Sequence, residues 1–397
     1  MIRTKRRIFI STGEVSGDLQ GALLVEALYR QAESAGIDLE IVATGGDRMA
    51  QAGAKLLADT SAIGSIGILE SVRYVLPTIR AQRQVKRWLR QNPPDLVVMI
   101  DYFGPNIGIG NFTRRFFPSV PTVYYIAPQE WVWSMSSANT QRIVRATDRL
   151  LAIFPAEADY YRKWGSEVAW IGHPLIDRMQ NAPSRSEART ILNLDPEATV
   201  ISLIPASRRQ EIQYILPVMF EAARQLQEKL QAKLPQVEFL IPLSLETYRE
   251  AIEQSIKSYG LRARLVADQT QAVLAASDLA ITKSGTVNLE LALLNVPQVV
   301  MYRLNPMTAW IAENLLKYAA PFISPVNLVL MQPIVPELLQ RQATPDCIVA
   351  ESLEFLLNPD RRSQILADYG RMRQQLGEVG VSDRAAREIL DLLPGME

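Results

Sequence analysis

The sequence predicts an α/β protein with two doubly wound, Rossmann-like domains that face each other across a cleft. Three observations indicate this fold class. Short apolar runs alternate with amphipathic stretches through the first half of the chain, which is typical of a parallel sheet covered by helices. A polar segment then interrupts the pattern, and the same alternation restarts behind it. In both halves, small residues follow an apolar run, where such sheets bind ligands.

The first domain is expected to span residues 1–178. Its first strand is predicted at 7–11, where Arg7 leads into Ile8-Phe9-Ile10. Further strands of the same sheet are predicted at 39–43, 96–100, 121–126 and 149–153.

The polar segment 178–190 lacks apolar periodicity and is the best linker candidate. A second domain is expected at 190–345, with strands at 199–204, 237–242, 263–266, 279–281 and 298–302. Residues 346–397 are expected to form C-terminal helices, and their packing back on the first domain is one option.

Composition narrows the function classes. The 397 residues include 42 basic and 42 acidic ones, so no net charge favours nucleic acid as a partner. The single cysteine, Cys347, cannot form an internal disulfide, and a secretory signal is not recognised, so a cytoplasmic location is expected. The longest uncharged run, 318–336, contains four prolines, which predicts that it does not span a membrane.

Histidine chemistry has little support in this chain. The one histidine, His173, excludes a two-histidine zinc motif and disfavours histidine-based nucleophilic catalysis. A general base is therefore expected to be a carboxylate.

Residues 283–290 read as a strand end, a turn of small residues and a helix start. A turn of this kind can direct backbone N–H groups at a phosphate. Glu290 follows Thr286 by one helical turn, a spacing at which its carboxylate can accept hydrogen bonds from a ribose diol. The segment thus fits a nucleotide site, and an ordinary turn with a solvated Glu290 remains the alternative.

The loop after the first strand, 11–18, is a candidate acceptor site. In the functional interpretation Glu14 or Asp18 orients a substrate hydroxyl. In the alternative, Asp18 or Ser16 caps the helix that follows.

Two further candidates also follow strands. Asp101 ends the apolar run 96–100 and fits a general base with aromatic neighbours, or a cap of the next turn. Arg208 lies at the corresponding strand-to-helix position of the second domain, where its guanidinium can place two donors on a diphosphate. Surface pairing with Glu211 is the alternative for an arginine here.

Residues 68–90 carry apolar residues at helical spacing, followed by five basic residues and no acidic residue after Glu70. The pattern is typical of a helix on an anionic membrane surface, or of a packed helix with a solvated face. Pro77 predicts that the helix is broken into two pieces. The aromatic residues of 124–133 fit a groove for acyl chains or sugars, or a domain interface.

Taken in order, these segments resemble the lipid-A-disaccharide synthase family, inverting glycosyltransferases of the GT-B type. The matching segments extend from near residue 8 to near residue 342, so they cover most of the chain. They are 13–18, 44–49, 67–70, Asp101, 125–128, 131–133, 172–175, 205–208, 284–286 with Glu290, 302–303, and Asn327 with 335–339.

The resemblance implies transfer of 2,3-diacylglucosamine from its UDP donor to 2,3-diacylglucosamine 1-phosphate, which gives a β-1,6-linked disaccharide and UDP. Asp101 is the implied general base, and Glu14 is a second candidate catalytic carboxylate. The implied substrate-binding residues are Ser16 and Asp18 for the acceptor, Arg208, Ser284, Gly285, Thr286 and Glu290 for UDP, and Asn327.

The same resemblance implies the partners. They are a UDP-diacylglucosamine donor, an acylated glucosamine phosphate acceptor and the inner membrane, which the protein is expected to contact peripherally. No metal, cofactor or nucleic acid is expected, and a homodimer is left open. The alternatives are another GT-B nucleotide-sugar enzyme with a different lipid acceptor, a UDP-sugar epimerase, or a non-catalytic membrane-surface descendant of the scaffold.

Overall fold

The computed structural model describes residues 5–60, 68–132, 137–205, 209–231, 233–234, 236–305 and 321–394. Of residues 14–15, 68–77 and 209–210 it describes the backbone alone. The chain divides into two compact units. Unit 1 is Met1–Asp177 with Leu376–Glu397, and unit 2 is Arg178–Gln375.

Unit 1 contains, within the described residues, a seven-stranded parallel sheet in the order β3-β2-β1-β4-β5-β6-β7. This is a doubly wound arrangement: successive strands are added on one side of β1 as far as β3, and from β4 onward they are added on its other side. The strand order thus reverses between β1 and β4. The elements are β1 (Lys5–Ser11), α1 (Glu14–Ser34), β2 (Asp38–Gly45), α2 (Asp47–Gln51), β3 (Lys55–Asp59), α3 (Ile68–Gln91), β4 (Leu96–Ile100), α4 (Phe103–Phe116), β5 (Thr122–Tyr125), α5 (Ser137–Arg145), β6 (Arg149–Ala152), α6 (Pro155–Lys163), β7 (Glu167–Trp170), α7 (Leu175–Met179), which crosses into unit 2, and α18 (Val381–Leu390).

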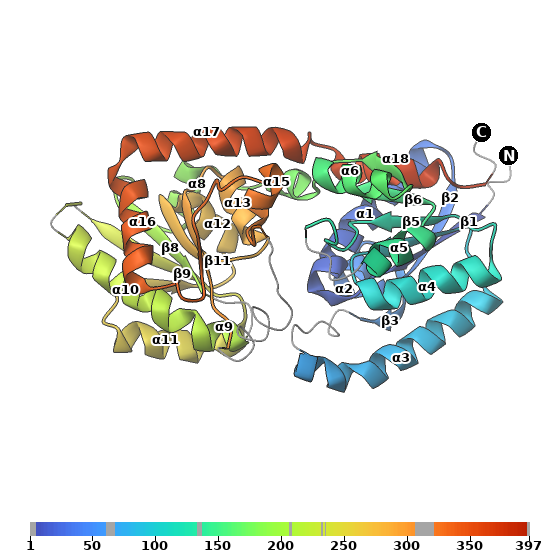
Figure 1. Ribbon diagram of the computed structural model, residues 1–397, viewed down its shortest axis with the longest axis horizontal. Coiled ribbons are helices and arrows are strands. Elements are labelled where there is room, and N and C mark those ends of the chain that lie inside the picture. Colours follow the sequence, from blue (N-terminus) through green and yellow to red (C-terminus); the bar gives the residue numbers. More distant parts are fainter. Residues whose placement is uncertain are drawn as a thin grey trace. The chain divides into compact units, whose positions relative to one another are not determined.

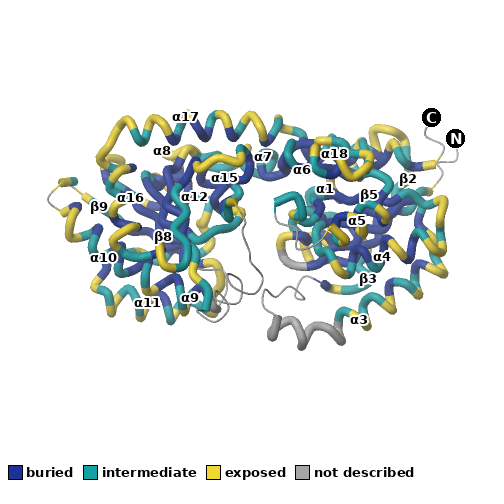
Figure 2. The backbone as a smooth tube through the Cα atoms, in the orientation of Figure 1, coloured by how far each residue is buried: buried dark blue, intermediate teal, exposed yellow. Residues whose placement is uncertain are grey.

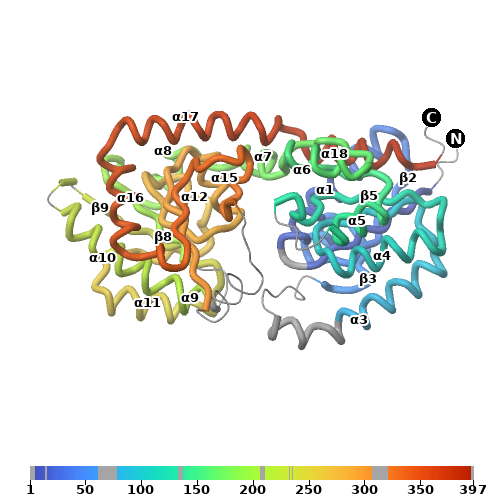
Figure 3. The backbone as a smooth tube through the Cα atoms, in the orientation of Figure 1, coloured from blue at the N-terminus to red at the C-terminus, as the bar shows by residue number. Residues whose placement is uncertain are grey.

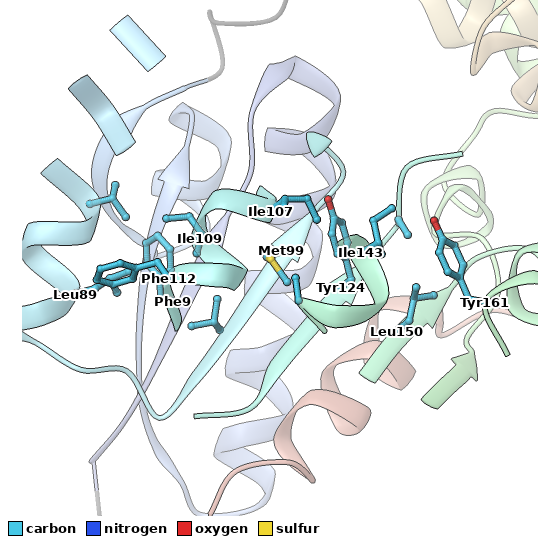
Figure 4. Close-up of a cluster of buried hydrophobic side chains, with 14 of the residues drawn as sticks. Phe9, Leu89, Met99, Ile107, Ile109, Phe112, Tyr124, Ile143, Leu150 and Tyr161 are labelled. Atoms are coloured by element: carbon cyan, nitrogen blue, oxygen red, sulfur yellow. The ribbon is translucent and has the colours of Figure 1, made fainter. Parts of the chain in front are cut away.

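One face of this sheet is covered by α3, α4, α5 and α6 (Figure 1). Phe9 from β1 and Met99 from β4 pack there against Leu89 of α3 and Phe112 of α4 (Figure 4). β4 is buried along its whole length, because parallel strands covered on both faces leave no polar side.

The opposite face carries α1 and the last helix of the chain. α18 lies beside α1 within unit 1, so the red end of the chain returns to the blue beginning (Figure 3). Val381, Ala385 and Ile389 of α18 recur at helical spacing and are fully buried, which explains the attachment.

Unit 2 contains, within its described residues, a six-stranded parallel sheet in the order β10-β9-β8-β11-β12-β13. The strand order reverses between β8 and β11. The elements are α8 (Arg185–Ile191), β8 (Thr199–Ile204), α9 (Arg209–Tyr214), α10 (Leu216–Leu230), β9 (Val237–Pro242), a 3₁₀ turn (Glu246–Tyr248), α11 (Arg249–Ser258), β10 (Ala263–Val266), α12 (Thr270–Ala276), β11 (Leu279–Lys283), α13 (Val287–Leu293), β12 (Gln298–Tyr302), α15 (Pro325–Leu330), β13 (Glu337–Leu339), α16 (Pro345–Leu357) and α17 (Pro359–Leu376).

The unit bounds differ from the predicted domain bounds at both crossings. The proposed linker 178–190 overlaps α8, which is capped by Ser184. Ala188 of this helix and Leu192, directly after it, are buried in the core of unit 2. Of the C-terminal segment 346–397, residues up to Gln375 belong to unit 2 and the remainder to unit 1.

All ten predicted strands are present, but three edge strands were not predicted. β3, β7 and β13 are short, and their residues are half-buried or exposed, so they lack the apolar run that marks a central strand. Figure 2 shows this for β3. The predicted break at Pro77 was wrong, since α3 continues through it as one helix. A helical proline removes a single hydrogen bond, and a helix of 24 residues can continue past that loss.

Candidate active site

In each unit the predicted site residues gather near the two neighbouring strands between which the strand order reverses. β1 pairs with β4 in unit 1, and β8 pairs with β11 in unit 2. The loops that follow these strands therefore start side by side at the carboxyl edge of each sheet, where doubly wound proteins bind ligands.

In unit 1 the loops after β1 and β4 touch each other. A Cβ atom added to Gly13 would lie 2.5 Å from a ring carbon of Tyr102. No side chain fits at position 13 unless Tyr102 moves. The small residue noted in the sequence is thus explained by packing between the two loops.

Asp101, between β4 and α4, has an unusual backbone conformation. Its φ is +49°, that of Tyr102 is +43° and that of Ile126, after β5, is +57°. Residues other than glycine rarely adopt such angles, and each costs about 1–3 kcal/mol. These three strained residues gather at the ends of two paired strands, because the Asp101 N–H donates to the Ile126 carbonyl at 3.1 Å.

Asn106 holds this strained turn in place. The residue is fully buried, and its Nδ2 donates to the carbonyls of Ile100 at 3.0 Å and Asp101 at 2.7 Å. Its Oδ1 accepts the hydroxyl proton of Ser11 at 2.7 Å. The hydroxyl of Tyr124 also donates to the Asp101 carbonyl at 2.7 Å. The Asp101 backbone is fixed by these bonds, while its side chain is half-buried.

A second carboxyl group lies near Asp101. Glu157, in the first turn of α6, is almost fully buried. The pKa of Glu157 is raised to about 8. Burial is the main cause, hydrogen bonds from the N–H groups of Ile153, Phe154 and Ala127 oppose it in part, and the charge of Asp101 contributes to the rise. Glu157 is therefore mostly neutral at pH 7, so Asp101 does not face a second negative charge there.

Asp18 does not point to open space as an acceptor contact would. Its Oδ1 accepts the N–H groups of Gly46 at 2.8 Å and Met49 at 3.1 Å, and its Oδ2 accepts that of Arg48 at 3.3 Å. The carboxylate caps α2 and ties α1 to it. Ser16 is exposed on the first turn of α1, and the side chain of Glu14 lies outside the described part of the structure.

In unit 2 the loop after β11 is braced from both sides. The Ser284 hydroxyl donates to the carbonyl of Ile323 at 2.7 Å, and the Gly285 N–H donates to Oδ1 of Asn288 at 2.8 Å. Thr286 is exposed. Within the residues that the structure describes, the N–H groups of Thr286 and Val287 have no hydrogen-bond partner, so they are the groups of this turn left for a ligand.

Asn327 is predicted to bind substrate, but its polar atoms are all engaged. Its Nδ2 donates to the Val335 carbonyl at 3.0 Å and to Glu337 at 2.7 Å, and its Oδ1 accepts the N–H groups of Ile334 at 2.8 Å and Val335 at 2.9 Å. Glu337 in turn accepts the N–H of Ile323 at 2.9 Å. Asn327 therefore supports the segment that receives Ser284 and has no atom to spare for a ligand.

Glu290 is buried, which disagrees with the alternative that it is a solvated helix residue. Its Oε1 lies 3.2 Å from a guanidinium nitrogen of Arg178, also in unit 2. Burial raises the pKa of Glu290, and the charge of Arg178 lowers it in part.

Lys283 and Glu211 form an ion pair beside this loop that the sequence did not predict. Lys283 Nζ lies 3.3 Å from Glu211 Oε1, and the two side chains are 12% and 6% exposed. A Cβ atom on Gly285 would lie 3.6 Å from the same ammonium, so the cation sits next to the turn. Lys283 stands directly before Ser284-Gly285-Thr286 in the sequence, which was the available signal. Arg208 lies outside the described residues.

His173 is buried and neutral at pH 7. Burial lowers its pKa to about 4, and its Nδ1 accepts the N–H of Leu175 at 3.1 Å. Among the described residues, no group of three or more His, Cys, Asp or Glu side chains is placed to hold a metal ion. None of the described helices is long and apolar enough to cross a bilayer.

The fold matches solved structures over almost the whole chain. The MnaA protein of S. aureus, solved with UDP, has a TM-score of 0.66 at 17% identity and covers 98% of this chain and 97% of its own. The calicheamicin glycosyltransferase CalG4 has a TM-score of 0.58 at 18% identity and covers both chains completely. With its two Rossmann-like units, the chain thus has the GT-B fold.

Sequence comparison gives the particular family. A family model described as "Lipid-A-disaccharide synthetase" matches residues 8–390. The lipid-A-disaccharide synthase of Gloeothece citriformis is 58% identical and covers 97% of this chain and 99% of its own, and that of Synechocystis sp. is 53% identical over 98% and 99%. The chain belongs to the lipid-A-disaccharide synthase family and is a glycosyltransferase.

Proposed function

We propose that the protein transfers 2,3-diacylglucosamine from its UDP donor to 2,3-diacylglucosamine 1-phosphate, forming the β-1,6-linked disaccharide and UDP. Membership of the family over residues 8–390 supports the reaction. The assignment of the base is carried by the position of Asp101. It follows β4, one of the two strands between which the strand order reverses, and Asn106 fixes its backbone.

In this proposal Asp101 is the general base. It takes the proton from the acceptor 6-hydroxyl as that oxygen attacks the anomeric carbon of the donor and the bond to UDP breaks. Because Glu157 is mostly neutral at pH 7, it adds no second negative charge near Asp101. Ser16 and Glu14 are proposed to contact the acceptor, and Asp18 to position their loop through α2.

The donor is assigned to unit 2. Lys283, Arg208 and the N–H groups of Thr286 and Val287 are proposed to stabilise the negative charge that develops on the leaving diphosphate. Glu290 is proposed to accept hydrogen bonds from the ribose diol while Arg178 orients it. Ser284, Gly285 and Asn327 give the turn its shape.

Both substrates carry acyl chains, so the protein is proposed to meet them at the inner membrane through a peripheral contact of α3. The side chains of α3 are described from residue 78 onward. This part is a packed helix, with Val85 and Leu89 in the core and Arg83 and Arg87 exposed. The apolar side chains of 68–76 lie outside the described residues, and the contact is assigned to them.

The test is UDP release with both acylated sugars supplied, in the wild type and in Asp101→Asn. The variant should bind UDP normally by calorimetry yet release it roughly 10²–10⁴-fold more slowly, the usual range for loss of acid–base assistance. Asp38→Asn, an exposed residue at the start of β2, is the matched control and should behave as wild type.

Near-normal turnover in Asp101→Asn would move the base to Glu14 or remove it. UDP binding without any UDP release by the wild type would refute the transfer reaction and favour a non-catalytic descendant of the scaffold.

A further inference from the structure

Unit 1 has an open groove beside the Asp101 turn. It has a volume of about 440 Å³ and lies between the second half of α3 and the start of α4. Its wall includes Ile79, Gln82, Arg83 and Lys86 from α3, and Gly104 and Pro105 from α4.

The groove is open because α4 presents glycines to it. Gly104 and Gly108 are four residues apart and share one face of the helix. A Cβ atom on Gly104 would meet nothing within 4 Å. One on Gly108 would lie 3.4 Å from Gln82 Oε1 and 3.6 Å from Lys86 Nζ, so these polar atoms of α3 lie over the glycine face.

The residues that line the wall include two cations, Arg83 and Lys86, and no acid. Residues 71–91 and α4 contain no Asp or Glu. Neither Lys86 nor Arg83 forms an ion pair with another described residue. Burial lowers the pKa of Lys86, and no neighbouring charge opposes this, so its ammonium is partly dehydrated without a counter-ion. Lys86 Nζ lies 5.9 Å from the ring centre of Phe112, with which it makes a cation–π contact.

The start of α4 adds to this positive field. The helix has 14 residues and no acidic residue in its first turn. Pro105 has no N–H, and the Asn106 N–H donates to the Tyr102 carbonyl at 3.3 Å. The N–H groups of Phe103 and Gly104 therefore have no acceptor within the helix, and the helix dipole places partial positive charge there. Gly104 and Pro105 belong to both this turn and the groove, and α4 begins two residues after Asp101.

We propose that this groove binds the phosphate monoester of the acceptor, with Lys86 and Arg83 as its cationic contacts and the first turn of α4 beside it. A phosphate monoester carries about −1.5 to −2 charges at pH 7, which two cations and a helix N-terminus match. Ile79, 40% exposed, and Pro105 offer apolar surface for the acyl chains attached to the same sugar. This inference rests on the proposed transferase function, for which it names the residues that select a phosphorylated acceptor.

The test compares two acceptors, the acylated glucosamine 1-phosphate and the same sugar without phosphate. In the wild type, removing the phosphate should raise KM. Lys86→Gln should raise KM for the phosphorylated acceptor roughly tenfold or more, the size expected for a charge-assisted contact, and should leave KM for the other acceptor unchanged. Lys86→Arg should restore most of the difference.

The matched control is Arg87→Gln, which removes one charge from the exposed side of the same helix. It should change neither KM. If Lys86→Gln raises KM equally for both acceptors, or for neither, the groove does not read the phosphate and the inference is overturned.

The phosphate of an anionic phospholipid headgroup has the same chemistry as the acceptor phosphate. Sedimentation with phosphatidylglycerol vesicles distinguishes the two ligands. Lys86→Gln should sediment as the wild type does. Loss of vesicle binding with an unchanged preference for the phosphorylated acceptor would assign the groove to the membrane and refute the proposal. If the wild type releases no UDP with either acceptor, the transferase function fails. Calorimetric binding of the acylated glucosamine 1-phosphate to the wild type and Lys86→Gln still tests the groove, and equal affinities would overturn it.

Discussion

Glu157 should make the stability of unit 1 decrease as the pH rises. Its side chain is 1% exposed, and its pKa is about 8 in the folded protein against an ordinary value of 4.5. A carboxyl group whose folded pKa is raised favours the folded state most at low pH. That contribution is present below pH 4.5 and is lost as the pH rises from 4.5 towards 8.

The size of the effect follows from this shift. Each pKa unit corresponds to 1.36 kcal/mol, so the full difference is about 5 kcal/mol, and about 2.5 kcal/mol of it is lost between pH 6 and pH 9. Glu157→Gln keeps the shape of the group but cannot ionise. Its free energy of unfolding should therefore lack this part of the slope, and the variant should gain on the wild type at pH 9 relative to pH 6.

The assay is urea denaturation followed by tryptophan fluorescence at pH 6, 7, 8 and 9. Five of the six tryptophans precede residue 178, so the signal reports mainly on unit 1. Glu26→Gln, an exposed glutamate of α1, is the control and should keep the wild-type slope. Parallel slopes for the wild type and Glu157→Gln would refute the raised pKa and with it the neutral partner assigned to Asp101.

Two further predictions concern UDP and the membrane. Lys283→Met combined with Glu211→Gln, which avoids an unpaired buried charge, should weaken UDP binding at least tenfold by calorimetry, as should Arg208→Ala; unchanged dissociation constants in folded variants would remove these residues from the donor site. Replacing the four apolar residues of the α3 segment with serine should abolish binding to anionic vesicles at low salt and leave UDP affinity intact, whereas unfolding of that variant would make them core residues. The four are Ile68, Leu69, Val72 and Leu76.

The central strands were predictable because burial on both faces leaves a direct record in the sequence. β4 reads Leu-Val-Val-Met-Ile, and the corresponding β11 of unit 2 ends in the small-residue turn. Because both strands are central, the turns behind them could also be located from sequence. The edge strand β3, with the pattern exposed at both ends and half-buried between, gives no such record.

The roles of single polar residues were less predictable, because they depend on which loop packs beside them. Asp18 and Asn327 have the residue types of ligand contacts, but their oxygens accept backbone N–H groups of segments 28 and 7–8 residues away in sequence. Glu157 is one glutamate among many in the sequence. Its raised pKa arises from burial, to which residues distant in sequence contribute.

Both units use buried asparagine to hold the loop that follows a central strand. Asn106 joins β1 and β4 to the Asp101 turn, and Asn288 joins the Lys283 carbonyl to the Gly285 N–H. A primary amide carries two donors and two acceptor sites without net charge, so it can satisfy several backbone groups at once and avoids the cost of burying an ion. A carboxylate in the same place could accept bonds but could not donate to the Asp101 carbonyl. Neutral amides thereby hold the backbone at the ends of the strands that carry Asp101 and Lys283, and they add no further charge beside these two groups.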